Sequence, residues 1–196
     1  MKLQFNNLYL FSPHEKLGKR ISFTDGINVL TSDIEDGTKR GKSVIMRSLY
    51  HTLGADSFCE TKWEVENKVF ILEFSLDGIA YYMYRAASLF KLFDFKQKLL
   101  FTAVNRTDLM ENLKSLFGFA VMLPNRSSGE LVIAPPVYNY LPFFIDQDHY
   151  DGSQYTSFEN LRQFADFKNS VIYSHLGVYN EEYFSLMKKK EQMKCL

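Results

Sequence analysis

Residues 27–53 constrain the fold of this chain more than any other stretch. A short apolar run at 27–30 is followed by a polar loop at 31–43 and then by an apolar, helix-like run at 44–53. The helix-like run has no proline and no internal glycine, and it stops at Gly54, which is a typical residue just past a helix end. The pattern predicts a buried strand, a loop and a largely buried helix, and so a fold of the α/β class.

The loop closes with Gly41-Lys42-Ser43, the end of a Walker A phosphate-binding loop. Such a loop turns backbone N–H groups toward phosphate, its lysine reaches the β- and γ-phosphates, and its hydroxyl binds Mg²⁺. The helix that follows contributes the positive end of its dipole. We therefore expect ATP and Mg²⁺ as ligands, with Lys42 as a catalytic residue and Ser43 on the metal.

The loop departs from the full Walker A pattern at one position. The pattern requires glycine at 36, where this chain has Asp36, and Gly37 comes one place late. A carboxylate near the phosphates repels them, and its Cβ restricts the backbone. Lys39 and Arg40 add positive charge that offsets this in part. A degenerate loop that binds phosphate weakly or not at all is the alternative.

Composition narrows the class of protein further. The 196 residues are 46% hydrophobic, and 23 basic side chains balance 23 acidic ones, so no global field would attract a polyanion. The cysteines, Cys59 and Cys195, form no metal-binding or disulfide pattern. The chain opens without a signal peptide and has no run long enough to span a bilayer. We expect a cytoplasmic protein that does not enter membranes.

The remaining sequence predicts antiparallel strands and further helices around this unit. We expect a mixed sheet with an antiparallel meander and flanking helices: an opening hairpin at 3–23, a meander at 68–104, a helix at 107–118, a buried strand at 138–145, a helix from the capping box at 156–159, and a polar helical tail after 177.

Two further polar groups are candidates for the site. Asp146 and Gln147 follow the apolar run at 143–145, so either Asp146 is a Walker B carboxylate or Gln147 contacts Mg²⁺ or the attacking water; an ordinary polar strand end is the third interpretation. Lys16 and Arg20 flank the opening hairpin and could reach the nucleotide, although a solvated turn explains them equally well.

The order of these parts resembles the N-terminal half of an SMC/RecN-like ABC ATPase head. The resemblance rests on the hairpin, the loop ending in Gly41-Lys42-Ser43, the helix closing at 53–56, the run ending in Asp146-Gln147-Asp148, and the polar helix at the end. The amino-acid sequence of residues 40–50 and 53–56 is also similar to that of SMC-like subunits of bacterial defence systems of the Lamassu type.

The resemblance implies site residues and partners. The residues that it assigns to nucleotide binding are Gly37, Thr38, Lys39, Arg40, Gly41, Lys42, Ser43 and Val44, with Gln147 as the Q-loop glutamine on Mg²⁺. The family's signature motif, Walker B aspartate and catalytic glutamate lie in a C-terminal half, which with a second head is an implied partner. DNA, a nuclease and other accessory subunits are further candidates. Residues 1–178 would then be the ATPase lobe, and 179–196 the start of a coiled-coil arm.

The implied role is ATP binding in DNA repair, chromosome maintenance or defence against phages and plasmids, with hydrolysis only in the completed head. Two alternatives stay open. One is a self-contained P-loop kinase or NTPase with Asp146 as the Walker B residue, although the antiparallel strands before Asp146 count against it. The other is an interaction module with a degenerate loop.

Overall fold

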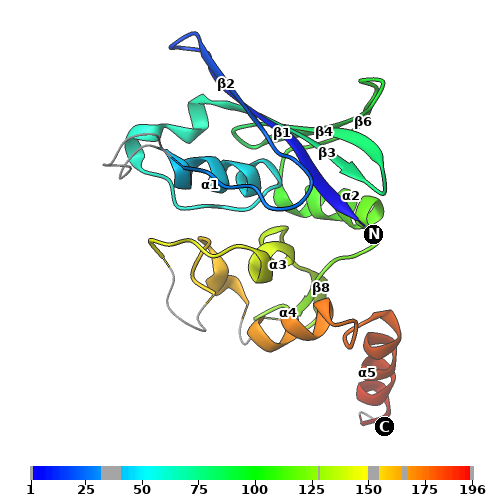
Figure 1. Ribbon diagram of the computed structural model, residues 1–196. Coiled ribbons are helices and arrows are strands. Elements are labelled where there is room, and N and C mark those ends of the chain that lie inside the picture. The colour runs from blue at the N-terminus through cyan, green and yellow to red at the C-terminus, as the bar shows by residue number, and fades with distance from the viewer. Residues whose placement is uncertain (1, 32–40, 128, 150–154, 165–166, 195–196) are drawn as a thin grey trace.

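Figure 1 shows the computed structural model, which describes residues 2–31, 41–127, 129–149, 155–164 and 167–194. An antiparallel sheet lies above two helices, α1 and α2, and a smaller assembly of helices and a hairpin lies below them. The fold class is therefore α/β, and the sheet is antiparallel.

The sheet has six strands in the order β2-β1-β3-β4-β5-β6, and each neighbouring pair is antiparallel. The strands are β1 (Leu3–Ser12), β2 (Leu17–Ser22), β3 (Val69–Leu76), β4 (Ile79–Ala86), β5 (Leu89–Asp94) and β6 (Leu99–Ala103). The opening hairpin and the meander are thus confirmed. Parallel pairing, which a mixed sheet requires, does not occur between the described strands.

One face of the sheet packs on the helices. Along β3, Phe70, Leu72 and Phe74 are fully buried while the residues between them are half-buried, which is the period-two pattern of a sheet with one covered face. Helices α1 (Lys42–Thr52) and α2 (Arg106–Phe117) cover that face.

Both helices match their predicted ranges closely. Gly54 follows α1 at a φ of 95° and Gly118 follows α2 at 63°, the left-handed backbone that favours glycine. The cap of α2 lies earlier than Thr107, because the Oδ1 atom of Asn105 accepts the backbone N–H of Asp108 at 2.9 Å.

The lower assembly carries the second half of the chain. It contains the hairpin β7 (Met122–Pro124) and β8 (Leu131–Ile133), the short helix α3 (Val137–Tyr140), and the helices α4 (Phe167–His175) and α5 (Glu181–Lys194). Single 3₁₀ turns lie at Thr61–Trp63, Val65–Asn67, Leu141–Phe143 and Leu161–Gln163. The polar tail is helical, as expected; its role as the start of an arm stays a prediction.

The predicted strand at 27–30 does not form. Ile27 is 93% exposed and Val29 79% exposed, and no described strand pairs with them. The side chain of Asn28 instead makes local hydrogen bonds with Thr24 and Gly26. A strand needs a neighbour for its backbone groups, and here the described chain supplies none.

Two predictions in the second half are also wrong. The apolar run at 138–145 is not a strand, because it opens as α3 and continues as a 3₁₀ turn, with Tyr138 and Leu141 buried. The capping box at 156–159 starts no helix. The Oγ atom of Ser157 accepts the distant N–H of Asp146 at 3.0 Å, and the next α-helix begins at Phe167. In the described part of the chain, no helix is long and apolar enough to cross a membrane.

Candidate functional site

The candidate site begins at the N-terminal end of α1. Gly41 has a φ of 78°, and its carbonyl accepts the N–H of Ile45 at 3.1 Å, so Lys42 and Ser43 stand in the first turn of the helix. This turn contains no acidic residue, and no side-chain hydrogen bond caps it at Gly41. A helix start with a lysine and a serine and no acidic residue in its first turn suits a phosphate group.

The remainder of the predicted loop lies outside the described residues. This applies to Gly37, Thr38, Lys39 and Arg40, and to the departure from the pattern at Asp36. Of the predicted cradle, Gly41, Lys42, Ser43 and Val44 are described, and Ser43 is the exposed member of this group.

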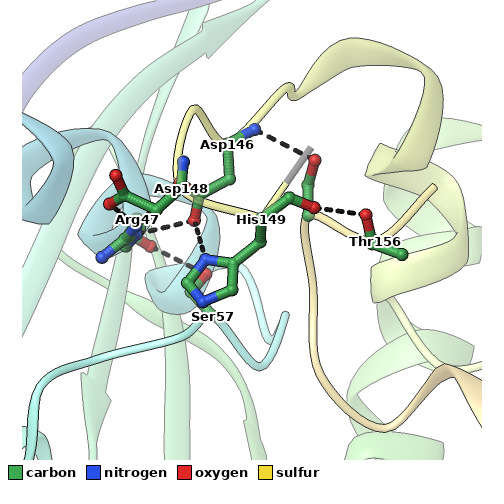
Figure 2. Close-up of polar contacts among 7 residues, drawn as sticks. Arg47, Ser57, Asp146, Asp148, His149 and Thr156 are labelled. Atoms are coloured by element: carbon green, nitrogen blue, oxygen red, sulfur yellow. Dashed lines mark hydrogen bonds and ion pairs between the residues drawn. The ribbon is translucent and has the colours of Figure 1, made fainter. Parts of the chain in front are cut away.

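A buried ion pair links α1 to the polar segment at 146–148, which contains the candidate site residues Asp146 and Gln147. The guanidinium of Arg47 donates through Nε to Oδ2 of Asp146 and through Nη2 to Oδ1, each at 2.7 Å. The same Nη2 atom donates to Oδ2 of Asp148 at 2.6 Å. Figure 2 shows this arrangement, which we call the Arg47 clamp: Arg47 with Asp146 and Asp148. The side chains of Arg47 and Asp146 are 7% and 1% exposed.

The clamp fixes the charge of both partners. Burial by itself would raise the pKa of Asp146, but the hydrogen bonds from Arg47 and from the backbone of Asp148 outweigh it and hold this pKa below its usual range. The hydrogen bond to Asp146 raises the pKa of Arg47 despite burial. The pair is therefore ionised across the neutral pH range.

Further contacts hold the clamp from the side. The Nδ1 atom of His149 lies 3.3 Å from Oδ2 of Asp146, and its ring stacks on Phe58 with centroids 3.9 Å apart. Ser57 donates to the carbonyl of Arg47 at 3.2 Å. These contacts bring the 57–58 segment and the 146–149 segment together on α1.

The clamp bears directly on the two roles proposed for the polar segment. Both carboxylate oxygens of Asp146 face Arg47, so a metal ion would have to compete with a bidentate guanidinium, which favours a structural role for Asp146. Gln147 lies between the two clamped aspartates and is exposed, so its side chain is available to a ligand.

Lys16 and Arg20 contact their own hairpin rather than α1. Lys16 lies in the turn between β1 and β2, where its N–H donates to the carbonyl of Pro13 at 3.3 Å. Arg20 donates through Nε to Asn7 at 2.9 Å and lies over the ring of Tyr9. A contact of Lys16 or Arg20 with the nucleotide stays a prediction.

Sequence reasoning missed a second buried arginine. Arg85 is 2% exposed and donates to the carbonyl of His51 in the last turn of α1 and to that of Ala87. Burial lowers the pKa of Arg85 to about 10. The signal was present in the sequence, because Arg85 is two positions from the buried Met83 and so shares its face of β4.

Metal binding by protein side chains alone finds no support in the described ranges. They contain no group of three or more histidine, cysteine, aspartate or glutamate side chains that could hold a metal ion.

Comparison with known proteins gives two relatives and no family model. No protein-family model matches the chain. It is 36% identical over 193 residues to the Lamassu protein LmuB of Bacillus cereus (strain VD014), which covers 98% of this chain and 33% of that protein. It is 27% identical over 174 residues to the Lamassu protein LmuB of a Bacillus species, which covers 87% of this chain and 30% of that protein.

These relatives support the resemblance to Lamassu-type systems that residues 40–50 and 53–56 suggested. The similarity runs through the whole of the site described above, because it covers nearly the entire chain. The chain spans about a third of the length of the curated relatives that it matches.

Proposed function

We propose that this chain is the ATP–Mg²⁺-binding N-terminal half of an SMC-like ABC ATPase head that acts in a Lamassu-type antiphage defence system. ATP hydrolysis then requires a C-terminal half, which brings the signature motif and the Walker B carboxylate, and a second head. The similarity to two LmuB proteins supports the defence role, and the site supports nucleotide binding.

The observation that carries the proposal is the start of α1. Gly41 takes the left-handed backbone, a Cβ built at Gly41 would meet no described residue within 4 Å, and Lys42 and Ser43 follow in a first turn without acidic residues. The backbone N–H groups of that turn, the lysine and the hydroxyl form the set that β- and γ-phosphates with Mg²⁺ require.

Exposed apolar residues next to this site support the need for a further segment. Ile27 and Val29 precede the loop and are 93% and 79% exposed, and Phe143 and Ile145 precede Gln147 and are 66% and 70% exposed. Large apolar side chains left exposed are typical of a surface that another part of the protein covers. A C-terminal half of the head would supply that cover and give 27–30 a neighbouring strand.

Isothermal titration of the chain with ATP and Mg²⁺ tests nucleotide binding. We expect wild type to bind and Lys42→Ala to lose at least tenfold in affinity, because the lysine charge on the phosphates is gone. Lys98→Ala removes an exposed lysine in the turn after β5 and is the matched control. Equal heats for wild type and Lys42→Ala would favour the interaction module with a degenerate loop.

The requirement for a C-terminal half has a separate test. We expect the chain alone to release almost no phosphate from ATP. Robust hydrolysis by the chain alone that Asp146→Asn abolishes would favour the self-contained P-loop kinase or NTPase. The engagement of both Asp146 oxygens by Arg47 argues against that outcome.

A further inference from the structure

We propose that Arg47 is a positioning residue, whose simultaneous grip on Asp146 and Asp148 holds Gln147 beside Ser43 so that both can act on the same Mg²⁺. This inference rests on the proposed function, because it assigns a role to Arg47 within the nucleotide site. Arg47 is not itself expected to touch the nucleotide.

The first step is the geometry of α1. Ser43 and Arg47 are four residues apart, so they lie on the same face of the helix, about 6 Å apart along its axis. Side chains on a helix lean toward its N-terminus. This tendency directs the guanidinium of Arg47 toward the turn that carries Ser43. The 143–146 segment follows α1 in the same direction, because Phe143 is bonded to Tyr50 and Asp146 to Arg47, one turn nearer the start of the helix.

The second step is the way in which the guanidinium is used. It binds the residue before Gln147 and the residue after it, with three donor–acceptor distances between 2.6 and 2.7 Å. The N–H of Asp148 also donates to Oδ1 of Asp146 at 3.2 Å, which closes the turn around Gln147. The backbone of Gln147 is thus fixed on both sides while its side chain stays exposed.

The third step is that anchoring alone does not need this arrangement. Tyr50 on the same helix already donates to the carbonyl of Phe143 at 3.2 Å. The rings of Tyr50 and Phe144 also pack together, with their centroids 4.9 Å apart. A buried ion pair is an inefficient way to add stability, because the desolvation of both charges opposes the attraction between them. A planar fork with fixed donor directions is, however, well suited to holding a turn in one orientation.

The test compares ATP affinity with and without Mg²⁺ in the same chain. Arg47→Lys keeps the charge and loses the fork, and Tyr50→Phe removes a different hydrogen bond between α1 and the same segment. We expect Arg47→Lys and Gln147→Ala each to reduce the Mg²⁺-dependent gain in ATP affinity about tenfold. The ATP affinity without Mg²⁺ should be unchanged. Tyr50→Phe should leave that gain intact. The double variant Arg47→Lys/Gln147→Ala should lose no more than either single one, since both changes remove the same contact.

Each result decides a stated point. If wild type gains affinity from Mg²⁺ and Arg47→Lys keeps that gain, the positioning role is overturned while ATP binding stands. It is overturned likewise if Gln147→Ala keeps the gain, or if the two losses add. If wild type binds no ATP, the proposed function fails first.

A milder variant covers the case in which Arg47→Lys does not fold. The carboxylate of Asp148 is 59% exposed, so Asp148→Ala removes one of the two acceptor groups of the clamp at little cost to the core. We expect a loss of several-fold in the Mg²⁺-dependent gain and no change without Mg²⁺. An unchanged gain in a folded Asp148→Ala protein contradicts the inference.

Discussion

Arg85, on the central strand β4, donates a hydrogen bond to the carbonyl of His51 in the last turn of α1. This contact ties the C-terminal end of the candidate nucleotide-binding helix to the sheet that it packs against. Arg85 also lies 4.8 Å from the ring centroid of Phe90, and its Nη2 atom is 3.9 Å from Asp56. The position of α1 therefore depends on a cation in the core.

Arg85→Lys should destabilise the fold although it preserves the charge. A lysine cannot reproduce the two directed hydrogen bonds to His51 and Ala87, and its ammonium would stay buried with fewer acceptors. We expect a loss of about 2–4 kcal/mol in the free energy of unfolding, measured by urea denaturation. Arg20→Lys, at an exposed position on β2, should change it by less than about 1 kcal/mol. Equal effects of the two variants would mean that Arg85 is not held by these contacts.

Gly54 and Gly118 both follow a helix with a positive φ, but only Gly54 is tightly packed. A Cβ at Gly54 would lie 2.5 Å from Cδ2 of the buried Leu109, whereas a Cβ at Gly118 would meet nothing within 4 Å. We expect Gly54→Ala to cost about 2–4 kcal/mol and Gly118→Ala about 1 kcal/mol, which is backbone strain alone. Thermal unfolding of the pair measures the difference. A smaller loss for Gly54→Ala than for Gly118→Ala would show that Leu109 gives way.

The elements that local patterns determine could be predicted from the sequence. The meander at 68–104 alternates with period two around turn residues such as Asp77-Gly78, and α1 and α2 combine an apolar face with a terminal glycine. In these cases the hydrogen bonds that form the element lie within the element or between neighbouring strands. Local sequence therefore carries the information.

The region around the clamp could not be predicted in the same way. The apolar run at 138–145 is buried on several sides, and such a run fits a helix or a strand equally well. Residues 156–159 looked like a capping box, but the hydroxyl of Ser157 within it accepts the N–H of Asp146 across the site. Arg47 and Asp146 are 99 positions apart, so their pairing leaves no local signal. The spacing of Arg47 four residues after Ser43 was the one available hint.

The segment 27–30 offers a direct test of its exposure. We expect the double variant Ile27→Ser/Val29→Ser to change the free energy of unfolding by less than about 0.5 kcal/mol, because both side chains are largely in solvent. Binding of a hydrophobic dye to the folded chain should fall. Leu8→Ser, at a fully buried position of β1, is the control and should cost about 3 kcal/mol or more. A loss above about 1 kcal/mol in the double variant would place this segment in the folded core.

The Arg47 clamp should make the stability of the chain depend on acid pH through Asp146. Its folded pKa is lowered, against about 3.9 in an unfolded chain. A lowered folded pKa means that the stabilisation is complete above about pH 4 and is lost as the pH falls through the folded pKa, because the unfolded state then binds the proton more readily.

Asp146→Asn isolates this contribution. At pH 6 we expect it to cost about 3 kcal/mol, since it leaves the buried Arg47 with half of its charge partners. The difference from wild type should shrink as the pH is lowered from 5 toward 2, because the wild-type carboxyl increasingly takes up a proton. Tyr50→Phe, which removes a contact between α1 and the same segment without removing a carboxyl, should show a constant deficit of about 1 kcal/mol over that range. Urea midpoints at half-unit pH steps measure both curves, and a gap for Asp146→Asn that does not narrow in acid would mean that the charge of Asp146 contributes nothing to holding the polar segment on α1.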